Sequence, residues 1–344
     1  MINGLIIYEN DDPIHNIVLL VESPKIQWRG AAGMADGVNE LMTPDHKFKI
    51  ASITKTFTAT IILQLIEEGM LNFNNTLADY LDNSNVILDS LVILNGISYG
   101  REITIKQLLN HTSSIRDYME DERFIPNILE NPSKQWSPKN IMEKYYEYNM
   151  NHKTYYPPGT DFDYSDVNYV LLAMIVEEVT GISFQQSLRQ RIFDPLKMEN
   201  SYLEFYEEPR GNNPFSHAYF STVDINLDVN TSFDWGGGGI VSTIEELNIF
   251  FRALLNGKLF KKQSTLTQML EEANKGRGGM DYDYGLGIQK RKIHDLTFYG
   301  HGGAYDCDVY YCPEKNISVC MSLNQMNTHG KRYELLFKAI EMAM

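Results

Sequence analysis

The first candidate for chemistry in this chain is the segment Ser52-Ile-Thr-Lys55, at the start of an apolar run. Residues three apart on a helix share one face, so the amine of Lys55 can reach the hydroxyl of Ser52. The positive end of the helix dipole favours an alkoxide and a neutral amine there, and this arrangement activates a serine nucleophile. The plainer alternative is a capping serine and a surface lysine, because this spacing also arises by chance.

The second candidate is Tyr164, in a Pro- and Gly-marked loop that runs into a helix beginning near Val167. A phenol just before a helix N-terminus feels the helix dipole. With Lys55 nearby, the pKa of Tyr164 could fall enough for it to shuttle protons. The alternative role for Tyr164 is packing.

The third candidate is His301, in the segment Tyr299-Gly-His-Gly-Gly-Ala-Tyr305 between two strand-like runs. Glycines such as Gly303 let a substrate backbone approach a strand edge closely. The alternative is a turn that carries an ordinary surface histidine.

The elements that must position these residues follow from hydrophobic periodicity and from caps and turn residues. Strand-like runs cover residues 16–22, 26–32, 285–292, 296–299, 305–312 and 317–323. Helical runs cover residues 54–69, 103–109, 167–180 and 331–344, and the capping boxes at 183–186 and 242–245 mark two further helix starts. Strands therefore bracket a helical middle.

This order predicts an α+β fold, in which an antiparallel β-sheet flanked by helices packs against a mostly helical lobe. Residues 1–50 and 284–344 are expected to form the discontinuous α/β sheet domain. Residues 51–283 are expected to form the helical insertion lobe. A cleft between the two is the expected ligand site.

Composition narrows the class of protein. The 30 Lys and Arg against 45 Asp and Glu give a formal net charge of −15, which disfavours nucleic acid and anionic lipid surfaces as partners. No apolar run is long enough to predict a membrane span. No signal peptide is visible, which is consistent with a cytoplasmic protein or with an exported one that has lost its signal. Three late cysteines predict packed, reduced thiols.

Taken together, the three segments resemble a known family. The order S-x-x-K, then P-x-G-x-x-F-x-Y-S-x-x-x-Y, then H-x-G is similar to the class C-like branch of the serine β-lactamase and penicillin-binding-protein superfamily. Two further stretches, 103–113 (ITIKQLLNHTS) and 238–247 (GGIVSTIEEL), are also similar to that branch. The resemblance spans about residues 15 to 325 and implies a β-lactamase/transpeptidase-like fold.

The resemblance implies a role for each matching residue. Ser52 would be the acylated nucleophile, Lys55 its activating amine and Tyr164 the proton shuttle. His301 would stand in the third motif, with the strand after it, including Gly303, holding the substrate. The backbone N–H groups of Ser52 and Ala304 would form the oxyanion hole.

Two positions depart from the family pattern. Asp166 occupies the usual Asn of Tyr-x-Asn, so the amide that would bind an acyl side-chain carbonyl is missing, and we expect weak β-lactam recognition. Its carboxylate would pair either with Lys55 or with a substrate ammonium. Ser114 replaces a common Gly, so the loop conformation there is expected to differ. A competing alignment reads Ser165-Asp-Val167 as the Ser-Asp-Asn element of class A enzymes.

Acidic residues near the motifs predict an acidic cleft. Asp161, Asp163 and Asp166 flank Tyr164, and two more carboxylates follow His301, at Asp306 and Asp308. The alternative for most of them is helix capping and loop solvation.

Other chemistries lack their sequence signatures. No H-E-x-x-H, C-x-x-C or G-x-x-x-x-G-K-[ST] pattern occurs, so no metal and no cofactor is expected. The glycine run 236–239 lacks a following Lys and predicts a conformational joint. The G-x-S-x-G pattern of α/β-hydrolases is also absent.

The resemblance therefore implies a serine hydrolase that acts through an acyl-enzyme on esters, amides or peptides, including small-acyl and D-amino-acid substrates. A β-lactamase or D,D-carboxypeptidase is the alternative activity, and a ligand sensor or scaffold is the non-enzymatic one. The expected partner is a small-molecule or peptide substrate, and no oligomeric state is assigned.

Overall fold

A seven-stranded antiparallel sheet is the frame of the protein in the computed structural model, which describes residues 2–7, 13–271 and 282–344. Its strand order is β10-β11-β12-β13-β14-β1-β2. The strands are β1 (Asn16–Glu22), β2 (Gln27–Gly33), β10 (Asp283–Tyr284), β11 (Gln289–Ile293), β12 (Leu296–Gly303), β13 (Cys307–Cys312) and β14 (Ile317–Ser322). The two ends of the chain meet where Val18 of β1 faces Ser322 of β14. The predicted α+β fold with an antiparallel sheet is confirmed.

The sheet is covered by helices on both faces. Successive side chains of a strand point to opposite faces, and in β1 both sets are buried. Leu19 belongs to the core beneath α13 (Lys331–Ala343), and Val18 belongs to the larger core that includes α11 (Ile244–Leu255). A nearly continuous apolar run in β1 is the sequence signature of this two-sided burial.

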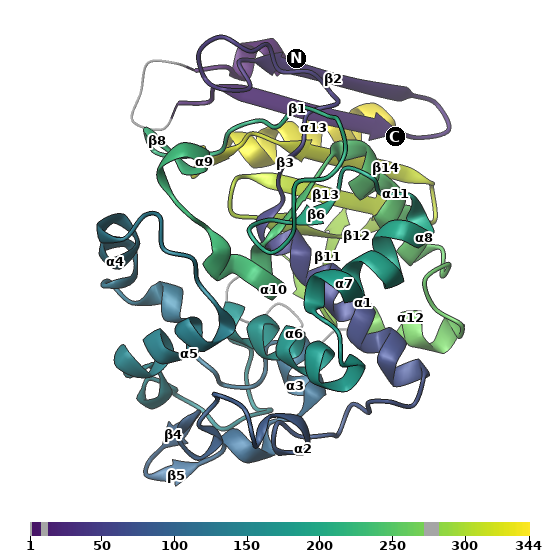
Figure 1. Cartoon of the computed structure of the whole chain (residues 1–344). Coiled ribbons are helices and arrows are strands. Elements are labelled where there is room, and N and C mark those ends of the chain that lie inside the picture. The colour runs from purple at the N-terminus through teal and green to yellow at the C-terminus, as the bar shows by residue number, and fades with distance from the viewer. Residues whose placement is uncertain (1, 8–12, 272–281) are drawn as a thin grey trace.

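The rest of the chain is mostly helical. Its helices are α1 (Thr54–Glu67), α2 (Ala78–Leu81), α3 (Ile105–Leu109), α4 (Phe124–Glu130), α5 (Pro138–Glu147), α6 (Asp166–Thr180), α7 (Phe184–Leu188), α8 (Asp194–Leu196), α9 (Ile225–Asp228), α10 (Trp235–Gly238) and α12 (Gln263–Met269). Short strands are β3 (Phe48–Lys49), β4 (Ile93–Leu94), β5 (Ile97–Ser98), β6 (Tyr202–Leu203), β7 (Tyr219–Phe220), β8 (Val223–Asp224), β9 (Ile240–Ser242) and β15 (Gln325–Met326). In Figure 1 the sheet and both termini lie at the top, α2, α3 and α5 lie in the lower half, and α4 lies at the left near mid-height.

The expected division into residues 1–50 with 284–344 and residues 51–283 stays a prediction, and parts of both ranges lie outside the described residues. Several contacts cross it. Helix α11, from the expected helical lobe, packs on the sheet, and β3 pairs with β9. One hydrophobic core runs through both parts, so the boundary is not a break in packing.

Of the two predicted capping boxes, one is confirmed and the other is displaced by one residue. At Ser183 the backbone N–H donates to Gln186 Oε1 at 3.2 Å, as a capping box requires. The box predicted at Ser242 is wrong by one residue, because Ser242 is the last residue of β9 and its hydroxyl bonds to Ser201 at 2.8 Å. Thr243 caps α11 instead.

Ser114 has φ +63°, the left-handed conformation that glycine favours. A residue with a Cβ is strained in this conformation. The side-chain oxygen of Ser114 is buried without a hydrogen-bond partner. The expected difference of this loop from the family pattern stays a prediction.

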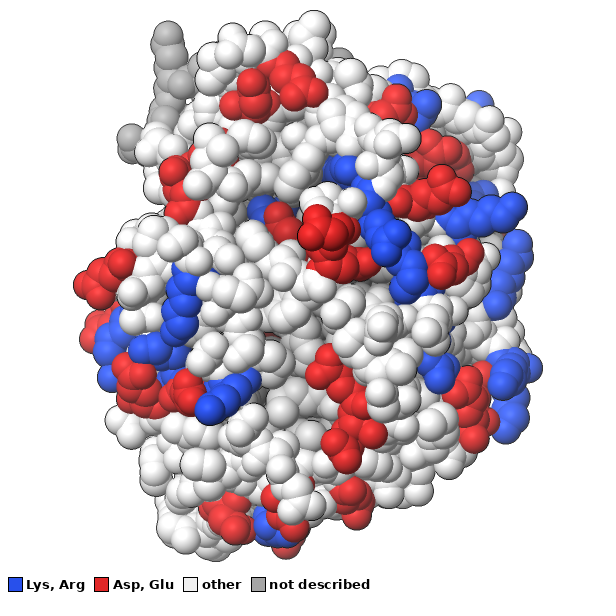
Figure 2. Space-filling view, viewed as in Figure 1, with Lys and Arg blue, Asp and Glu red and all other residues white. Residues whose placement is uncertain are grey.

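Charged side chains of both signs are interspersed on the face shown in Figure 2. Among the described residues, no single helix is long and apolar enough to cross a bilayer. Helix α6 and the segment Phe184–Leu196 reach that length only as a pair bent by 80°, and most of α6 is buried in the core. The three cysteines are free thiols, all buried.

Helix α1, which follows Ser52, is anchored to the sheet through aromatic stacking. Phe57 of α1 is fully buried, and its ring lies 3.7 Å from the ring of Phe250 of α11, with 12° between their planes. Because α11 packs on β13 and β14, this stack fixes the helix that carries Lys55 relative to the sheet.

We expect Phe57→Ala to lower the free energy of unfolding by about 3 to 5 kcal/mol, since it removes a fully buried ring and leaves a cavity. Urea unfolding followed by circular dichroism measures this. Phe337→Ala on α13, where the ring is 38% exposed, is the matched control and should change it by less than about 0.5 kcal/mol. Equal losses in the two variants would contradict the anchoring role of Phe57.

Candidate active site

Ser52 lies in a tight turn that the sheet holds from one side. The turn is a 3-10 segment (Ala51–Ile53) leading into α1, and Ala51 has φ +46°, a strained conformation for a residue with a Cβ. Gly303, at the end of β12, packs against it. A Cβ at Gly303 would lie 2.4 Å from the carbonyl oxygen of Ile50, so only glycine allows the strand to approach this closely.

Lys55 is fully buried, and its ammonium is surrounded by oxygen atoms. Nζ lies 3.1 Å from Ser52 Oγ and 2.9 Å from the carbonyl oxygen of Gly237, and it also donates to Asp166 Oδ1. These three acceptors match the three N–H bonds of an ammonium group. The predicted proximity of Ser52 and Lys55 is confirmed, and the surface-lysine alternative is excluded.

Asp166 pairs with Lys55, which was one of the two partners expected for it. Its position is set by the start of α6 and by Asp117, whose Oδ2 accepts the backbone N–H of Asp166 at 2.7 Å. Burial, together with the charge of Asp166, raises the pKa of Asp117 to about 8. The sequence did not identify Asp117 as part of the site, because no local pattern marks a carboxylate whose partner, Asp166, lies about fifty residues further along the chain.

Tyr164 lies beside the nucleophile but does not have the acidity that the sequence predicted. Burial, reinforced by the charge of Asp166, raises its pKa well above the usual value and outweighs a hydrogen bond with the side chain of Ser52. The expectation of a lowered pKa for Tyr164 is therefore wrong. The free-energy cost of desolvating its phenolate exceeds the stabilisation that the helix dipole provides. The Lys55 ammonium lies 5.0 Å from the centre of the Tyr164 ring.

His301 is completely buried, and both of its ring nitrogens have protein partners. Nδ1 lies 2.7 Å from the carbonyl oxygen of Gly302 and must donate to it, so Nε2 accepts from the hydroxyl of Tyr284 at 3.0 Å. Burial, with the nearby charge of Lys55, lowers the pKa of His301 to about 3, and the ring is neutral. The surface-histidine alternative is wrong, and contact of His301 with a substrate stays a prediction.

Tyr284 connects His301 to a second buried histidine. The Nδ1 atom of His111 accepts from the Asn168 amide at 3.0 Å and from the backbone N–H of Ser165 at 3.2 Å. Its Nε2 must therefore carry the proton that faces the Tyr284 hydroxyl at 3.3 Å. The His111 ring stacks on Tyr164 at 4.3 Å, so this network fixes the position of the Tyr164 ring.

The glycine run 236–239 was predicted to be a conformational joint, and it passes between charged side chains. A Cβ at Gly237 would lie 3.0 Å from Asp166 Oδ1 and 3.5 Å from Lys55 Nζ. A Cβ at Gly238 would lie 3.3 Å from the carboxyl carbon of Asp234. The missing side chains leave room for the ion pair on one side and for Asp234 on the other.

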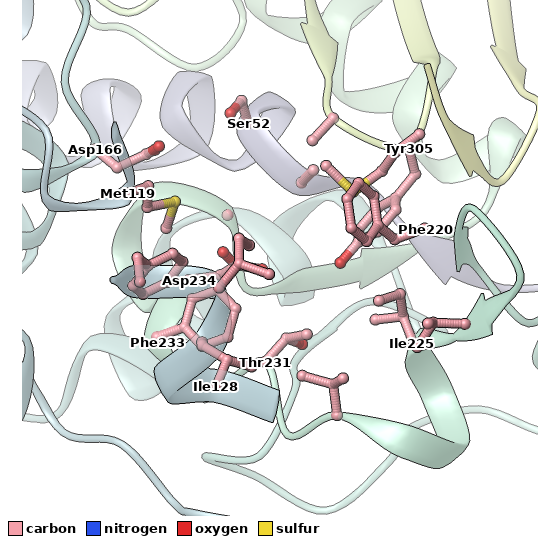
Figure 3. A pocket seen from close by; sticks show the side chains of 18 of the residues that line it. Ser52, Met119, Ile128, Asp166, Phe220, Ile225, Thr231, Phe233, Asp234 and Tyr305 are labelled. Atoms are coloured by element: carbon pink, nitrogen blue, oxygen red, sulfur yellow. The ribbon is translucent and has the colours of Figure 1, made fainter. Parts of the chain in front are cut away.

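A cavity of about 260 Å³ opens beside Ser52, and Ala304 also lines it. Figure 3 shows the rings of Phe220 and Tyr305 on one side of this pocket and Met119 on the other. Most of the remaining lining is apolar: Phe124, Ile125, Ile128, Leu129, Val223, Ile225, Val229, Phe233 and Met326. The pocket therefore favours a large apolar group next to the nucleophile.

The expected acidic cleft needs correction. Asp163 binds Arg116 at 2.6 Å, and Asp308 binds Arg332 at 2.6 Å, so neither carboxylate is available to a ligand in the pocket. The acids that line the pocket are Asp166 and Asp234. Sequence reasoning missed Asp234, although it lies two residues before the glycine run that the analysis singled out.

Asp234 has a perturbed acidity. Burial raises the pKa of its carboxyl group to about 7, with a further contribution from the charge of Asp166. Within the described residues, no three His, Cys, Asp or Glu side chains come together as a metal site.

The sequence of this chain is similar to those of known proteins. A family profile described as Beta-lactamase matches residues 17–341. The D-aminopeptidase of Brucella ovis is 25% identical over 321 residues, which cover 89% of this chain and 55% of that protein. The chain thus spans a little over half the length of such relatives.

Solved structures give closely matching folds. A D-stereospecific amidohydrolase from Streptomyces sp. is 30% identical, with a TM-score of 0.78 over 95% of this chain and 94% of that one. The D-amino acid amidase of Ochrobactrum anthropi SV3, in a complex with L-phenylalanine amide, is 22% identical with a TM-score of 0.78 over 95% and 92% of the two chains. The penicillin binding protein of Bacillus halodurans is 22% identical with a TM-score of 0.74, over 95% of each chain.

We expect Asp166→Asn to lower kcat by about 100-fold on a neutral ester and on an amine-bearing amide alike, because the carboxylate holds Lys55 in place. Steady-state kinetics with p-nitrophenyl acetate and D-phenylalanine p-nitroanilide measures this. Asp161→Asn, in the exposed loop before Tyr164, is the control and should leave both rates within twofold. An effect confined to the KM of the amine-bearing substrate would instead assign Asp166 to substrate binding.

Proposed function

The chain belongs to the Beta-lactamase family, and from this membership and the pocket geometry we propose that it is a serine hydrolase that cleaves amides or peptides through an acyl-enzyme at Ser52. The observation that carries the proposal is the buried ammonium of Lys55, 3.1 Å from Ser52 Oγ and paired with Asp166. A fully buried lysine beside a half-buried serine is a costly arrangement for a purely structural site.

Activation of Ser52 begins with the ion pair. Lys55 passes one proton to Asp166 along their hydrogen bond, and its amine then accepts the hydroxyl proton of Ser52 as Oγ attacks the substrate carbonyl. The developing oxyanion is stabilised by the backbone N–H groups of Ser52 and Ala304, both of which line the pocket.

Tyr164 acts in its protonated form. Because its pKa is raised, the phenol donates its proton to the departing nitrogen when the carbon–nitrogen bond breaks, and it takes up the proton held by the Lys55–Asp166 pair. Water then attacks the acyl group on Ser52, and the same groups return a proton to Oγ. His301 and Gly303 support this arrangement from β12, and His301 holds its neutral ring against Tyr284.

The substrate class follows from the pocket and from the relatives. The apolar lining suits an acyl group with a large apolar side chain. A D-stereospecific amidohydrolase and D-aminopeptidases are among the similar proteins, so D-amino-acid amides are the first class we assign. Esters of small acids are the second class, because the same machinery acts on them. β-Lactam turnover is the weaker alternative, since Asp166 replaces the amide donor and is bound to Lys55.

A fluorophosphonate probe should attach to Ser52, and Ser52→Ala should lose both the label and the turnover, because the acyl-enzyme needs the hydroxyl. Mass spectrometry of the intact protein and burst kinetics with p-nitrophenyl acetate measure this, and EDTA should leave the rate unchanged. Ser98→Ala, at the exposed end of β5, is the control and should behave as wild type. An unlabelled wild type without turnover would favour a ligand sensor or scaffold.

D-Phenylalanine amide should be hydrolysed faster than L-phenylalanine amide, and nitrocefin should be turned over slowly or not at all. An unpaired carbonyl acceptor costs about 1 to 3 kcal/mol, which corresponds to roughly 5- to 150-fold in rate. Measuring kcat/KM on these three compounds and on p-nitrophenyl acetate ranks the classes. A nitrocefin rate equal to that of the best amide or ester would reverse the ranking.

A further inference from the structure

Asp234 is the carboxylate of the pocket that the proposed mechanism does not use. It lies immediately before α10, lines the same cavity as Ser52 and is partly exposed to it. Figure 3 shows its carboxylate among the side chains of the pocket, with Phe233 and Thr231 beside it. An acid in a mostly apolar cavity is costly unless a ligand or a protein group balances its charge.

The cations near Asp234 already have other partners. Lys49 is bound by Glu204 and donates to the hydroxyl of Thr231 at 3.2 Å. Lys55 is bound by Asp166. Both lysines lower the pKa of Asp234 from a distance, but in the described part of the chain neither forms a salt bridge or hydrogen bond with it.

Asp234 is therefore the carboxylate of the pocket lining that has no lysine partner in the described ranges. Glu204 and Asp166 are paired with the two lysines, and Asp117, which also faces Lys55, lies outside the lining and accepts the backbone N–H groups of Asp166 and Met119. A cationic ligand in the pocket would balance the charge of Asp234.

Packing and a backbone hydrogen bond, from the N–H of Asp234 to the carbonyl oxygen of Thr231 at 3.0 Å, hold Asp234 in this position. The next residue, Trp235, is buried and has φ +30°, a strained conformation for a bulky side chain. The centre of its ring lies 5.6 Å from that of Phe184 and 6.1 Å from that of Tyr206. The absence of a Cβ at Gly238 then leaves the space that the carboxyl group occupies.

We infer that Asp234 is a specificity-determining residue, which binds a positively charged amine on the acyl group of the substrate while the apolar walls of the pocket hold its side chain. This inference rests on the proposed function and names the substrate feature that the site selects: an amine-bearing, apolar acyl group. Asp166 does not fill this role because Lys55 occupies its carboxylate.

Binding measurements separate the proposed role of Asp234 from catalysis. In a Ser52→Ala background, which prevents turnover, calorimetry compares D-phenylalanine amide with 3-phenylpropanamide, the same molecule without its amine. Adding Asp234→Asn should raise the Kd of D-phenylalanine amide by about 10- to 150-fold, the worth of a charge-assisted hydrogen bond. The Kd of 3-phenylpropanamide should stay within twofold.

Asp228→Asn is the matched control, because it removes one negative charge from an exposed side chain that does not line the pocket. It should leave both affinities unchanged. The Asp234→Asn protein should also unfold at the same temperature as its parent or at a higher one, since an unbalanced carboxylate has been removed. A purely structural role would instead lower that temperature.

Each of the following results would overturn the inference. An unchanged affinity of the Asp234→Asn variant for D-phenylalanine amide, or an equal loss for both ligands, would remove the selective role of Asp234. A marked effect of Asp228→Asn would show that long-range charge, rather than contact in the pocket, attracts the amine. If the wild type hydrolyses no amide and the Ser52→Ala protein binds neither ligand, the proposed function itself fails. Turnover of D-phenylalanine amide at equal kcat/KM by wild type and Asp234→Asn refutes the inference alone.

Discussion

The buried ammonium of Lys55 is the constraint on which the rest of the pocket depends. A charge without solvent is stable only when acceptors surround it, and three separate segments supply them: Ser52, Asp166 and the carbonyl of Gly237. Each of these segments must reach the same point in space. The turn before α1, the start of α6 and the helix α10 are therefore positioned by one cation.

Close backbone approach makes this convergence possible. Gly237 and Gly303 stand where a Cβ would meet the ion pair or the carbonyl of Ile50. Ala51 and Trp235 adopt positive φ angles on either side of the same region. Such strain persists only where the surrounding packing holds the backbone in place. Here the two strained residues are the chain neighbours of Ser52 and of Asp234.

Burial sorts the titratable groups of the pocket into neutral and charged ones. Desolvation keeps His301 unprotonated and holds the proton on the Tyr164 phenol, and it raises the pKa of Asp117. The charge that remains is concentrated in the Lys55–Asp166 pair and, when ionised, in Asp234. In a low dielectric, each of these few charges interacts more strongly with its surroundings than it would in water. Each charge therefore has a larger effect on proton transfer and on substrate recognition.

The sequence by itself determined the features that depend on local spacing. The three-residue interval places Ser52 and Lys55 on one helix face, and periodicity located most strands of the antiparallel sheet and the longer helices. The family resemblance implied that Tyr164 and Ala304 belong to the same site, and in the structure Tyr164 lies beside Lys55 while Ala304 lines the pocket. Helix caps depended on tertiary contacts as well, because at Ser242 a contact with Ser201 displaced the predicted cap by one residue.

Only the tertiary structure decided which partner each polar group has. Asp166 lies 111 positions from Lys55, and the carbonyl of Gly237 lies 182 positions from it, so no local pattern could choose between an ion pair and a substrate contact. The direction of the Tyr164 pKa depended in the same way on burial and on its charged neighbours. Only the folded structure shows that Asp234 lines the pocket and that both nearby lysines pair with other residues. Desolvation and pairing are properties of the folded environment, whereas helical and strand periods are properties of the chain.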